Sequence, residues 1–239
     1  HFYCRGGLKV NDRYIKCHKT TGHGSLDFAG ALSQSCNPAF MEIGQKIGAS
    51  LFFKYFVGFG FTERTGIDML SESKVTDVLY FSEKQLNILN LSVASFGQNF
   101  KVTPIQMITA MAAVANGGKL MKPYVVQQIL DSNGNVISNT EPVVKRQVIS
   151  ENTSKRISKM LADSVNGGGA KNAYIPGYRM AGKTGTSEKT DKNVANKTKD
   201  VVASFAGFAP ADNPKYAILV MLDEPQTAIR YGGTIAAPV

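Results

Sequence analysis

The sequence lacks the long apolar run that a membrane-spanning helix requires. No stretch approaches the ~20 consecutive apolar residues needed to cross a bilayer. The first five residues also do not follow the charged-then-apolar order of a signal peptide. We therefore expect any membrane anchor to lie outside these 239 residues. Internal repeats and low-complexity linkers are missing too, so one domain over residues 1–239 is the simplest description of the chain.

Acidic side chains are in short supply. The 18 Asp and Glu residues stand against 27 Lys and Arg, which gives a net charge of +9. That excess by itself favours anionic partners such as nucleic acid, membrane lipid or wall polymers. The basic residues are scattered, however, apart from a polar stretch at 189–199, and no helix shows a Lys/Arg stripe with interleaved aromatics. We expect that stretch to be a solvated loop and the chain to bind no nucleic acid.

Cysteine is scarce, and three cysteines are too few for a disulfide scaffold. Cys4, Cys17 and His18 nevertheless offer thiolate and imidazole ligands that suit zinc, and the interval between the two cysteines lets a loop fold back. A fourth ligand would come from His1, Asp12 or a carboxylate before His1. A structural zinc is one prediction for these residues, and free thiols or a disulfide between Cys4 and Cys17 stay open as alternatives.

Helical patterns fill the first two thirds of the chain, after a polar and irregular segment at 11–24. The expected helices cover residues 26–34, 38–48, 52–60, 83–94, 104–115 and 151–165. Ser25, Thr103 and Ser150 are the expected N-caps of the first, fifth and sixth of these helices, because their hydroxyls can accept from the free amides of a first turn.

A hairpin is expected before the last of these helices, where 125–130 and 136–137 flank an Asn-Gly turn, and extended patterns fill the end of the chain. Residues 179–188, 201–209 and 216–223 are apolar or alternating runs bounded by turn signals. Three sequential strands joined by short turns make an antiparallel meander. Helices first and a sheet last predict an α+β fold, an antiparallel sheet flanked by helices.

The strand at 179–188 carries Lys183-Thr184-Gly185-Thr186. Lys183 and Gly185 point to one side of an extended strand while Thr184 and Thr186 point to the other, and Gly185 removes a side chain where a ligand backbone can approach. An ammonium and hydroxyls can hold a substrate carboxylate, and a backbone N–H can face a developing oxyanion. By itself the Lys-Thr-Gly-Thr sequence is weak evidence for a binding site, since it is also compatible with a solvated strand at the edge of a sheet.

A second motif, Ser35-Cys36-Asn37, falls in the tight joint between two expected helices. Ser-x-Asn and Lys-Thr-Gly are two parts of a three-part active site whose third part is a nucleophilic Ser-x-x-Lys. No Ser-x-x-Lys occurs in the 34 residues before Ser35, so we expect the nucleophile to precede His1. Ser71-Glu72-Ser73-Lys74 fits the pattern formally, but it follows Ser35 in an expected exposed loop.

Nearly the whole chain resembles the transpeptidase domain of class B penicillin-binding proteins, and fits the division and sporulation branch, including the stage V sporulation protein D type. The matching blocks are residues 23–40, 96–98, 102–106, 116–123, 204–210 and 231–239. The resemblance implies the fold shared by penicillin-binding proteins and serine β-lactamases, truncated at both ends. Within it, His23 belongs to a structural block, and Cys36 is expected to be a small buried residue.

The resemblance also implies roles for the motif residues. Ser35 would relay protons between the missing nucleophile and the leaving group, and Asn37 would bind an amide of the substrate. Lys183 would supply positive potential near Ser35. Thr184 and Thr186, on either side of Gly185, would hold the carboxylate of a stem peptide or of a β-lactam, and the N–H of Thr186 would form half of an oxyanion hole.

The implied activity is a peptidoglycan D,D-transpeptidase that cross-links stem peptides through a serine acyl-enzyme and is a target of β-lactams. Catalysis would need no cofactor. The implied setting is the extracytoplasmic face of the membrane, with an upstream anchor and a glycosyltransferase partner. A β-lactam sensor or β-lactamase of the same fold, and a non-catalytic scaffold fragment, are the alternatives.

Overall fold

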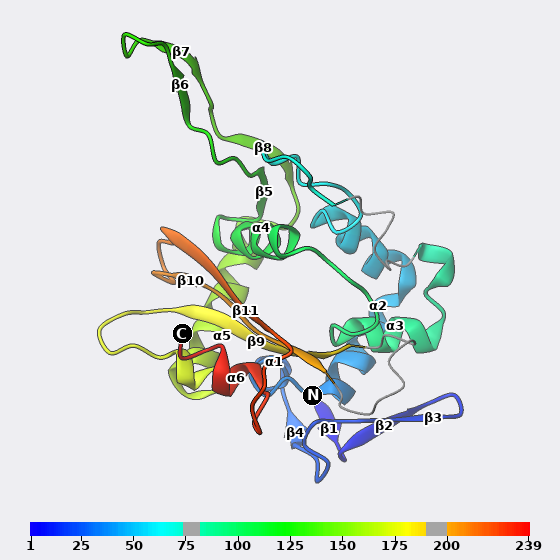
Figure 1. Ribbon diagram of the computed structural model, residues 1–239. Coiled ribbons are helices and arrows are strands. Elements are labelled where there is room, and N and C mark those ends of the chain that lie inside the picture. The colour runs from blue at the N-terminus through cyan, green and yellow to red at the C-terminus, as the bar shows by residue number, and fades with distance from the viewer. Residues whose placement is uncertain (74–81, 190–199) are drawn as a thin grey trace.

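The computed structural model describes residues 1–73, 82–189 and 200–239 (Figure 1). Its α-helices are α1 (Phe28–Ser33), α2 (Asn37–Gly58), α3 (Ile88–Ser95), α4 (Pro104–Ala115), α5 (Glu151–Gly167) and α6 (Gly232–Ile235), with short 3-10 helices η2 (Glu83–Gln85) and η3 (Lys171–Ala173). Its strands are β1 (Phe2–Cys4), β2 (Gly7–Val10), β3 (Arg13–Lys16), β4 (Gly24–Leu26), β5 (Lys119–Lys122), β6 (Gln128–Leu130), β7 (Val136–Asn139), β8 (Val143–Gln147), β9 (Ala181–Glu188), β10 (Val201–Ala209) and β11 (Tyr216–Asp223).

The largest sheet is the predicted antiparallel meander, in the order β11-β10-β9. The prediction of an α+β fold is therefore confirmed. The register sets Lys183 opposite Ala206 and Thr186 opposite Ala203. Among the described strands β9 pairs with β10 alone, so one edge of the strand that carries Lys-Thr-Gly has no neighbouring strand.

Helices cover both faces of this sheet (Figure 1). Phe208 is almost fully buried and packs in a cluster with Leu161 and Ala162 of α5. Phe205, three residues earlier and therefore on the opposite face, packs with Ala236 and Ala237 beside α6. The sheet is thus held between α5 and α6, which fixes the position of β9.

Several helix boundaries follow from local signals. Thr103 caps α4 in a capping box with Gln106, as expected of its hydroxyl, and Ser150 caps α5. The N-cap of α1 is Asp27, whose carboxylate accepts a hydrogen bond from the amide of Gly30. The prediction that Ser25 caps this helix is therefore wrong.

Other predictions needed correction. The two helices expected at 38–48 and 52–60 form one element, α2, with a kink at Gly48, whose φ of 79° is not helical. The helix expected at 83–94 divides into η2 and α3, because Asn87 caps a new helix. The expected irregular segment 11–24 contains β3, which pairs with β2 as a hairpin.

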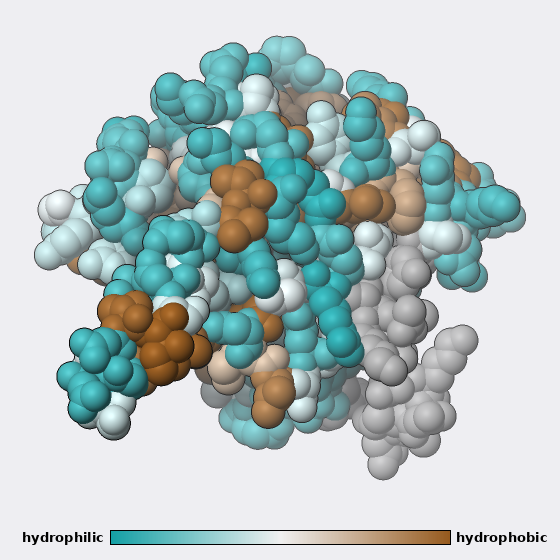
Figure 2. Space-filling view, turned by 90° about the horizontal axis from the view of Figure 1, so that it is seen from above, coloured by the Kyte–Doolittle hydropathy of each residue, from teal (hydrophilic) through white to brown (hydrophobic). Residues whose placement is uncertain are grey.

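The predicted hairpin is present as β6 and β7, which project away from the sheet and helices (Figure 1). Its loop spans 131–135 rather than two residues, and Asp131 holds it by accepting from the amides of Asn133 and Asn135. Viewed from above, the molecule shows separate apolar patches among hydrophilic side chains (Figure 2). In the described part of the chain, no helix is long and apolar enough to cross a membrane.

Candidate active site

Ser35 lies on the turn between α1 and α2, and Asn37 is the first residue of α2, so the motif falls at the joint between two helices that the sequence predicted. The backbone of Ser35 has a φ of 49°, a left-handed conformation that is uncommon for a residue with a side chain. Its amide and that of Cys36 donate to carbonyls in the last turn of α1, which closes the turn. The side-chain amide of Asn37 donates to the carbonyl of Lys16 at 3.1 Å. This bond leaves the Asn37 Oδ1 available to accept from a ligand amide.

Lys183 connects the turn to the sheet. Its Nζ donates to Ser35 Oγ, across 148 residues of sequence, and also to the carbonyl of Thr184 at 3.0 Å. Burial lowers the pKa of the Lys183 ammonium from an ordinary value of 10.5 to about 8, because a desolvated charge is disfavoured. A lysine with that pKa can share a proton with a neighbouring hydroxyl near neutral pH, which suits proton relay.

The open edge of β9 carries backbone groups that face a ligand site. Gln98 Nε2 donates to the carbonyl of Thr186 at 3.4 Å, and Lys183 donates to that of Thr184, so both carbonyls point away from β10. In an antiparallel strand the N–H and C=O of one residue point to the same side. The N–H of Thr186 therefore points to the open edge, the direction that an oxyanion-binding amide requires.

The Thr186 side chain is held by α6. Its Oγ1 accepts from the amide of Gly232 at 3.0 Å, so its own proton stays available for an acceptor. A Cβ on Gly232 would lie 2.1 Å from the carbonyl oxygen of Gly185, so only glycine lets α6 approach β9 this closely. A Cβ on Gly185 would lie 2.6 Å from Ser204 Oγ, a hydroxyl that would have to rotate away to make room.

Gln98 and His18 were not assigned to this site from the sequence. Gln98 lies in the matching block 96–98, but nothing in the residues around it indicates that its side chain contacts β9. The imidazole of His18 interacts with the backbone of Ser35, while burial first and then the charge of Lys183 lower its pKa. Only the fold brings His18 beside these two residues. Its Nδ1 lies 3.9 Å from Cys17 Sγ, but His18 is not in the group of four potential ligands that converge around that sulfur.

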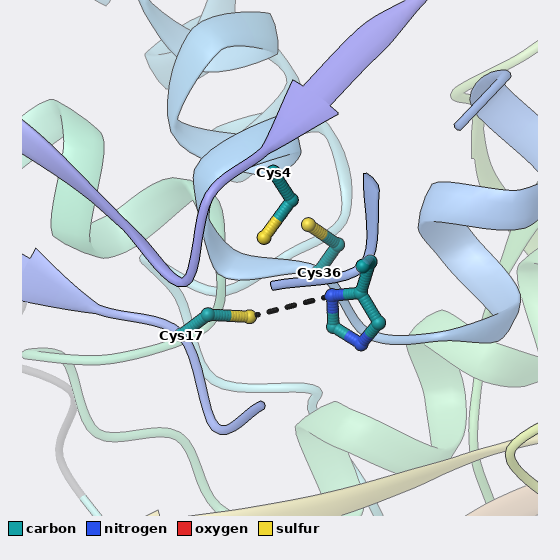
Figure 3. Close-up of side chains that lie close together, drawn as sticks. Cys4, Cys17 and Cys36 are labelled. Atoms are coloured by element: carbon teal, nitrogen blue, oxygen red, sulfur yellow. Dashed lines mark hydrogen bonds between the residues drawn. The ribbon is translucent and has the colours of Figure 1, made fainter. Parts of the chain in front are cut away.

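The cysteine cluster differs from the predicted one. Cys4 and Cys17 come together as expected, but the other two members are Cys36 and His23, and all four ligand atoms lie within 4.8 Å of one another. The three cysteines are buried free thiols, and Figure 3 shows their sulfurs converging. Burial raises the pKa of Cys36 to about 12, and burial also raises the pKa of Cys17. Cys36 is buried, as predicted, but it is not isolated.

The formal Ser-x-x-Lys at 71–74 falls at the edge of the described structure. Ser71 lies on an exposed turn with a φ of 66°, and Lys74 is outside the described residues. Most of the stretch at 189–199 is outside them as well. Lys189, at its start, is ion-paired with Asp223 and Glu224.

The lowered pKa of Lys183 predicts a pH dependence of stability. Between pH 8 and 10.5 the unfolded chain binds a proton at this lysine that the folded chain does not. The free energy of unfolding should therefore rise with pH in that window, by up to about 1.4 kcal/mol per pH unit, relative to Lys183→Met. Urea unfolding of both proteins at a series of pH values measures the difference. Parallel profiles would contradict the buried position of this ammonium.

Comparison with known families places these features in context. Residues 1–239 match the family described as the penicillin binding protein transpeptidase domain. Stage V sporulation protein D of Bacillus subtilis is 39% identical over all of this chain, which covers 36% of that protein. Peptidoglycan D,D-transpeptidase FtsI of Escherichia coli is 27% identical over 97% of the chain, which covers 37% of it. The chain therefore spans less than two fifths of the length of these two curated relatives.

Solved structures show the same fold. Penicillin binding protein 3 of Mycobacterium tuberculosis, in complex with aztreonam, superposes with a TM-score of 0.84 at 26% identity, over 99% of this chain and 54% of that one. The transpeptidase domain of Burkholderia pseudomallei penicillin-binding protein 3 superposes with a TM-score of 0.82 at 25% identity. The match covers 98% of this chain and 66% of that one. The expected fold is confirmed.

Proposed function

The chain belongs to the penicillin-binding protein transpeptidase domain family, and from that premise we propose that it is the acyl-transfer domain of a peptidoglycan D,D-transpeptidase. Relatives carry that activity in their names, and a related structure contains a bound β-lactam. Stem peptides of peptidoglycan are the proposed substrates, and β-lactams acylate the same serine.

The observation that carries the proposal is the contact between Lys183 and Ser35. Two short motifs, far apart in sequence, meet beside the open edge of β9. A hydroxyl, an ammonium and the free amide of Thr186 then face one site, and these are the groups that acyl transfer from a serine requires. The nucleophilic serine itself belongs, in this proposal, to a Ser-x-x-Lys that precedes His1.

The reaction assigns one task to each group. The upstream serine attacks the carbonyl of the D-Ala-D-Ala bond, and its proton passes through Ser35 to the departing D-Ala amine. Lys183 stabilises the developing negative charge around this relay. Asn37 accepts from a substrate amide, while the hydroxyls of Thr184 and Thr186 bind the terminal carboxylate. An amine on the stem peptide of a neighbouring peptidoglycan strand then attacks the carbonyl of the acyl-enzyme. This step forms the cross-link and releases the serine.

The proposed protein is longer than this chain. We propose an upstream membrane anchor that holds the domain on the extracytoplasmic face of the membrane, and a glycosyltransferase partner that supplies glycan strands. Acyl transfer by these groups needs no metal or cofactor. Division and sporulation are the two cellular settings that the relatives' names suggest.

Intact mass spectrometry of the full protein tests this function. After incubation with benzylpenicillin, the denatured protein should gain the mass of one drug molecule, and replacing the serine of the upstream Ser-x-x-Lys by Ala should abolish the gain. Absence of the adduct in the wild-type protein would overturn the proposal and favour a non-catalytic scaffold. Rapid loss of the adduct with release of hydrolysed drug would instead identify a β-lactamase.

A further inference from the structure

Four potential metal ligands from separate parts of the N-terminal region converge behind the Ser35 turn. Cys4 ends β1, Cys17 follows β3, His23 precedes β4, and Cys36 is the N-cap of α2. Their ligand atoms all lie within 4.8 Å of one another. The close-up shows the three sulfurs converging (Figure 3). Cys17 Sγ lies 3.6 Å from His23 Nδ1.

Backbone packing holds these segments in place before any ligand binds. A Cβ on Gly6 would lie 1.9 Å from the carbonyl oxygen of Thr20, and a Cβ on Gly22 would lie 2.4 Å from that of Cys4. Both glycines have positive φ values, which disfavour other residues. The amide of Cys17 also donates to the carbonyl of Gly6 at 2.9 Å. The turns that present Cys4, Cys17 and His23 are thus fixed against each other.

Backbone N–H groups lie close to two of the sulfurs. Those of Gly6 and His23 are near Cys4, and those of Lys19 and Asn37 are near Cys17. Neighbouring amides can orient a sulfur as the outer partners of a metal site do.

We propose that Cys4, Cys17, His23 and Cys36 bind one structural zinc ion. Three thiolates and one imidazole form a closed tetrahedral donor set of the kind that structural zinc prefers. With zinc–sulfur bonds of about 2.3 Å, two sulfurs of such a tetrahedron lie about 3.8 Å apart. The ligand atoms here lie within 4.8 Å of one another, so small side-chain movements would bring them to bonding distance of one metal ion.

The zinc ion has a direct consequence for the active site. Cys36 stands between Ser35 and Asn37, and Cys17 follows Lys16, whose carbonyl accepts from Asn37. A metal bound to both cysteines ties the Ser35 turn to the β2–β3 hairpin. The zinc therefore positions Ser35 and Asn37 without touching the substrate.

A disulfide is the competing state, because extracytoplasmic proteins form them readily. Any pair among the three cysteines would consume two sulfurs and leave one thiol and the imidazole of His23 without a function. A zinc ion, in contrast, uses all four side chains.

Metal analysis of the full protein tests the site directly. Protein purified without chelator, dialysed, and then incubated with zinc salt should contain one zinc per chain by mass spectrometry of the metal. His23→Gln should lower bound zinc at least about tenfold, since loss of even an outer partner costs that much. His18→Gln is the matched control and should keep its zinc. Its Nδ1 lies 3.9 Å from Cys17 Sγ, but His18 is not among the four residues whose ligand atoms all lie within 4.8 Å of one another.

The wild-type protein provides a test that does not depend on a variant folding. Alkylation after denaturation with chelator should modify all three cysteines, and Co²⁺ in place of zinc should give the intense visible absorption of tetrahedral thiolate coordination. A mass lower by two hydrogens, with only one cysteine modified, would show a disulfide and overturn the proposal. Three free thiols that retain neither zinc nor cobalt would overturn it too.

Discussion

Replacement of Lys183 by Ala is expected to slow acylation of the full protein by benzylpenicillin on the order of 10²- to 10³-fold. The variant removes the hydrogen bond from the ammonium to Ser35 Oγ, and with it the positive potential beside that hydroxyl. Stopped-flow measurement of the second-order acylation rate gives the effect. Lys183→Met retains most of the apolar stem, so an equal loss in that variant assigns the effect to the charge rather than to packing.

Lys189→Ala is the matched control for this prediction. Lys189 follows the same strand, β9, but it is exposed, and its ammonium pairs with Asp223 at 2.7 Å and Glu224 at 2.6 Å. Exposed ion pairs contribute about 0–1 kcal/mol to stability, and this one lies outside the site, so the acylation rate should change less than about twofold. An equal loss in the two lysine variants would refute a specific role for Lys183.

Phe208→Ala is expected to lower the free energy of unfolding by about 3–5 kcal/mol, the range for removal of a buried aromatic ring. Phe208 is 1% exposed and packs between β10 and α5 against Leu161, Ala162 and Ala181. Because Ala162 and Ala181 are too small to fill the space of the ring, its removal leaves a cavity that the sheet and helix cannot easily close. Urea unfolding followed by circular dichroism measures the change in the domain's transition.

Tyr216→Ala provides the comparison on the same sheet. Tyr216 begins β11, opposite Ala209, and is 72% exposed, so truncation of its ring should cost less than about 1 kcal/mol. Equal losses in the free energy of unfolding for Phe208→Ala and Tyr216→Ala would show that the ring of Phe208 does not lie in the core. A small effect in both would show that the packing between α5 and the sheet is looser than its burial indicates.

Local signals accounted for much of the fold. Thr103 as an N-cap predicted the start of α4, Ser150 predicted that of α5, and the apolar runs predicted β10 and β11 with their observed limits. These signals lie within a few residues of the features they specify. The kink at Gly48 was missed, because a glycine in a helical pattern does not show whether the chain ends or bends.

The short strands were harder to predict. β3 lies in a polar segment where its residues are mostly exposed, so no alternation of apolar and polar side chains marks it. β5 pairs with β8 across the projecting hairpin, and a pairing between distant segments leaves no signal in either one alone. Such strands are stabilised by partners that the local sequence does not contain.

The sequence by itself determined which chemical groups are present, because Ser-x-Asn and Lys-Thr-Gly each lie within a few residues and carry their own backbone geometry. Only the tertiary structure decided which groups meet. It set Lys183 against Ser35, placed His18 beside the backbone of Ser35, and brought His23 rather than His18 into the group of four converging ligands. The side chains of adjacent residues in a turn point in different directions, so two neighbours in sequence can belong to different sites. The packing of distant segments determines which side chain enters each site.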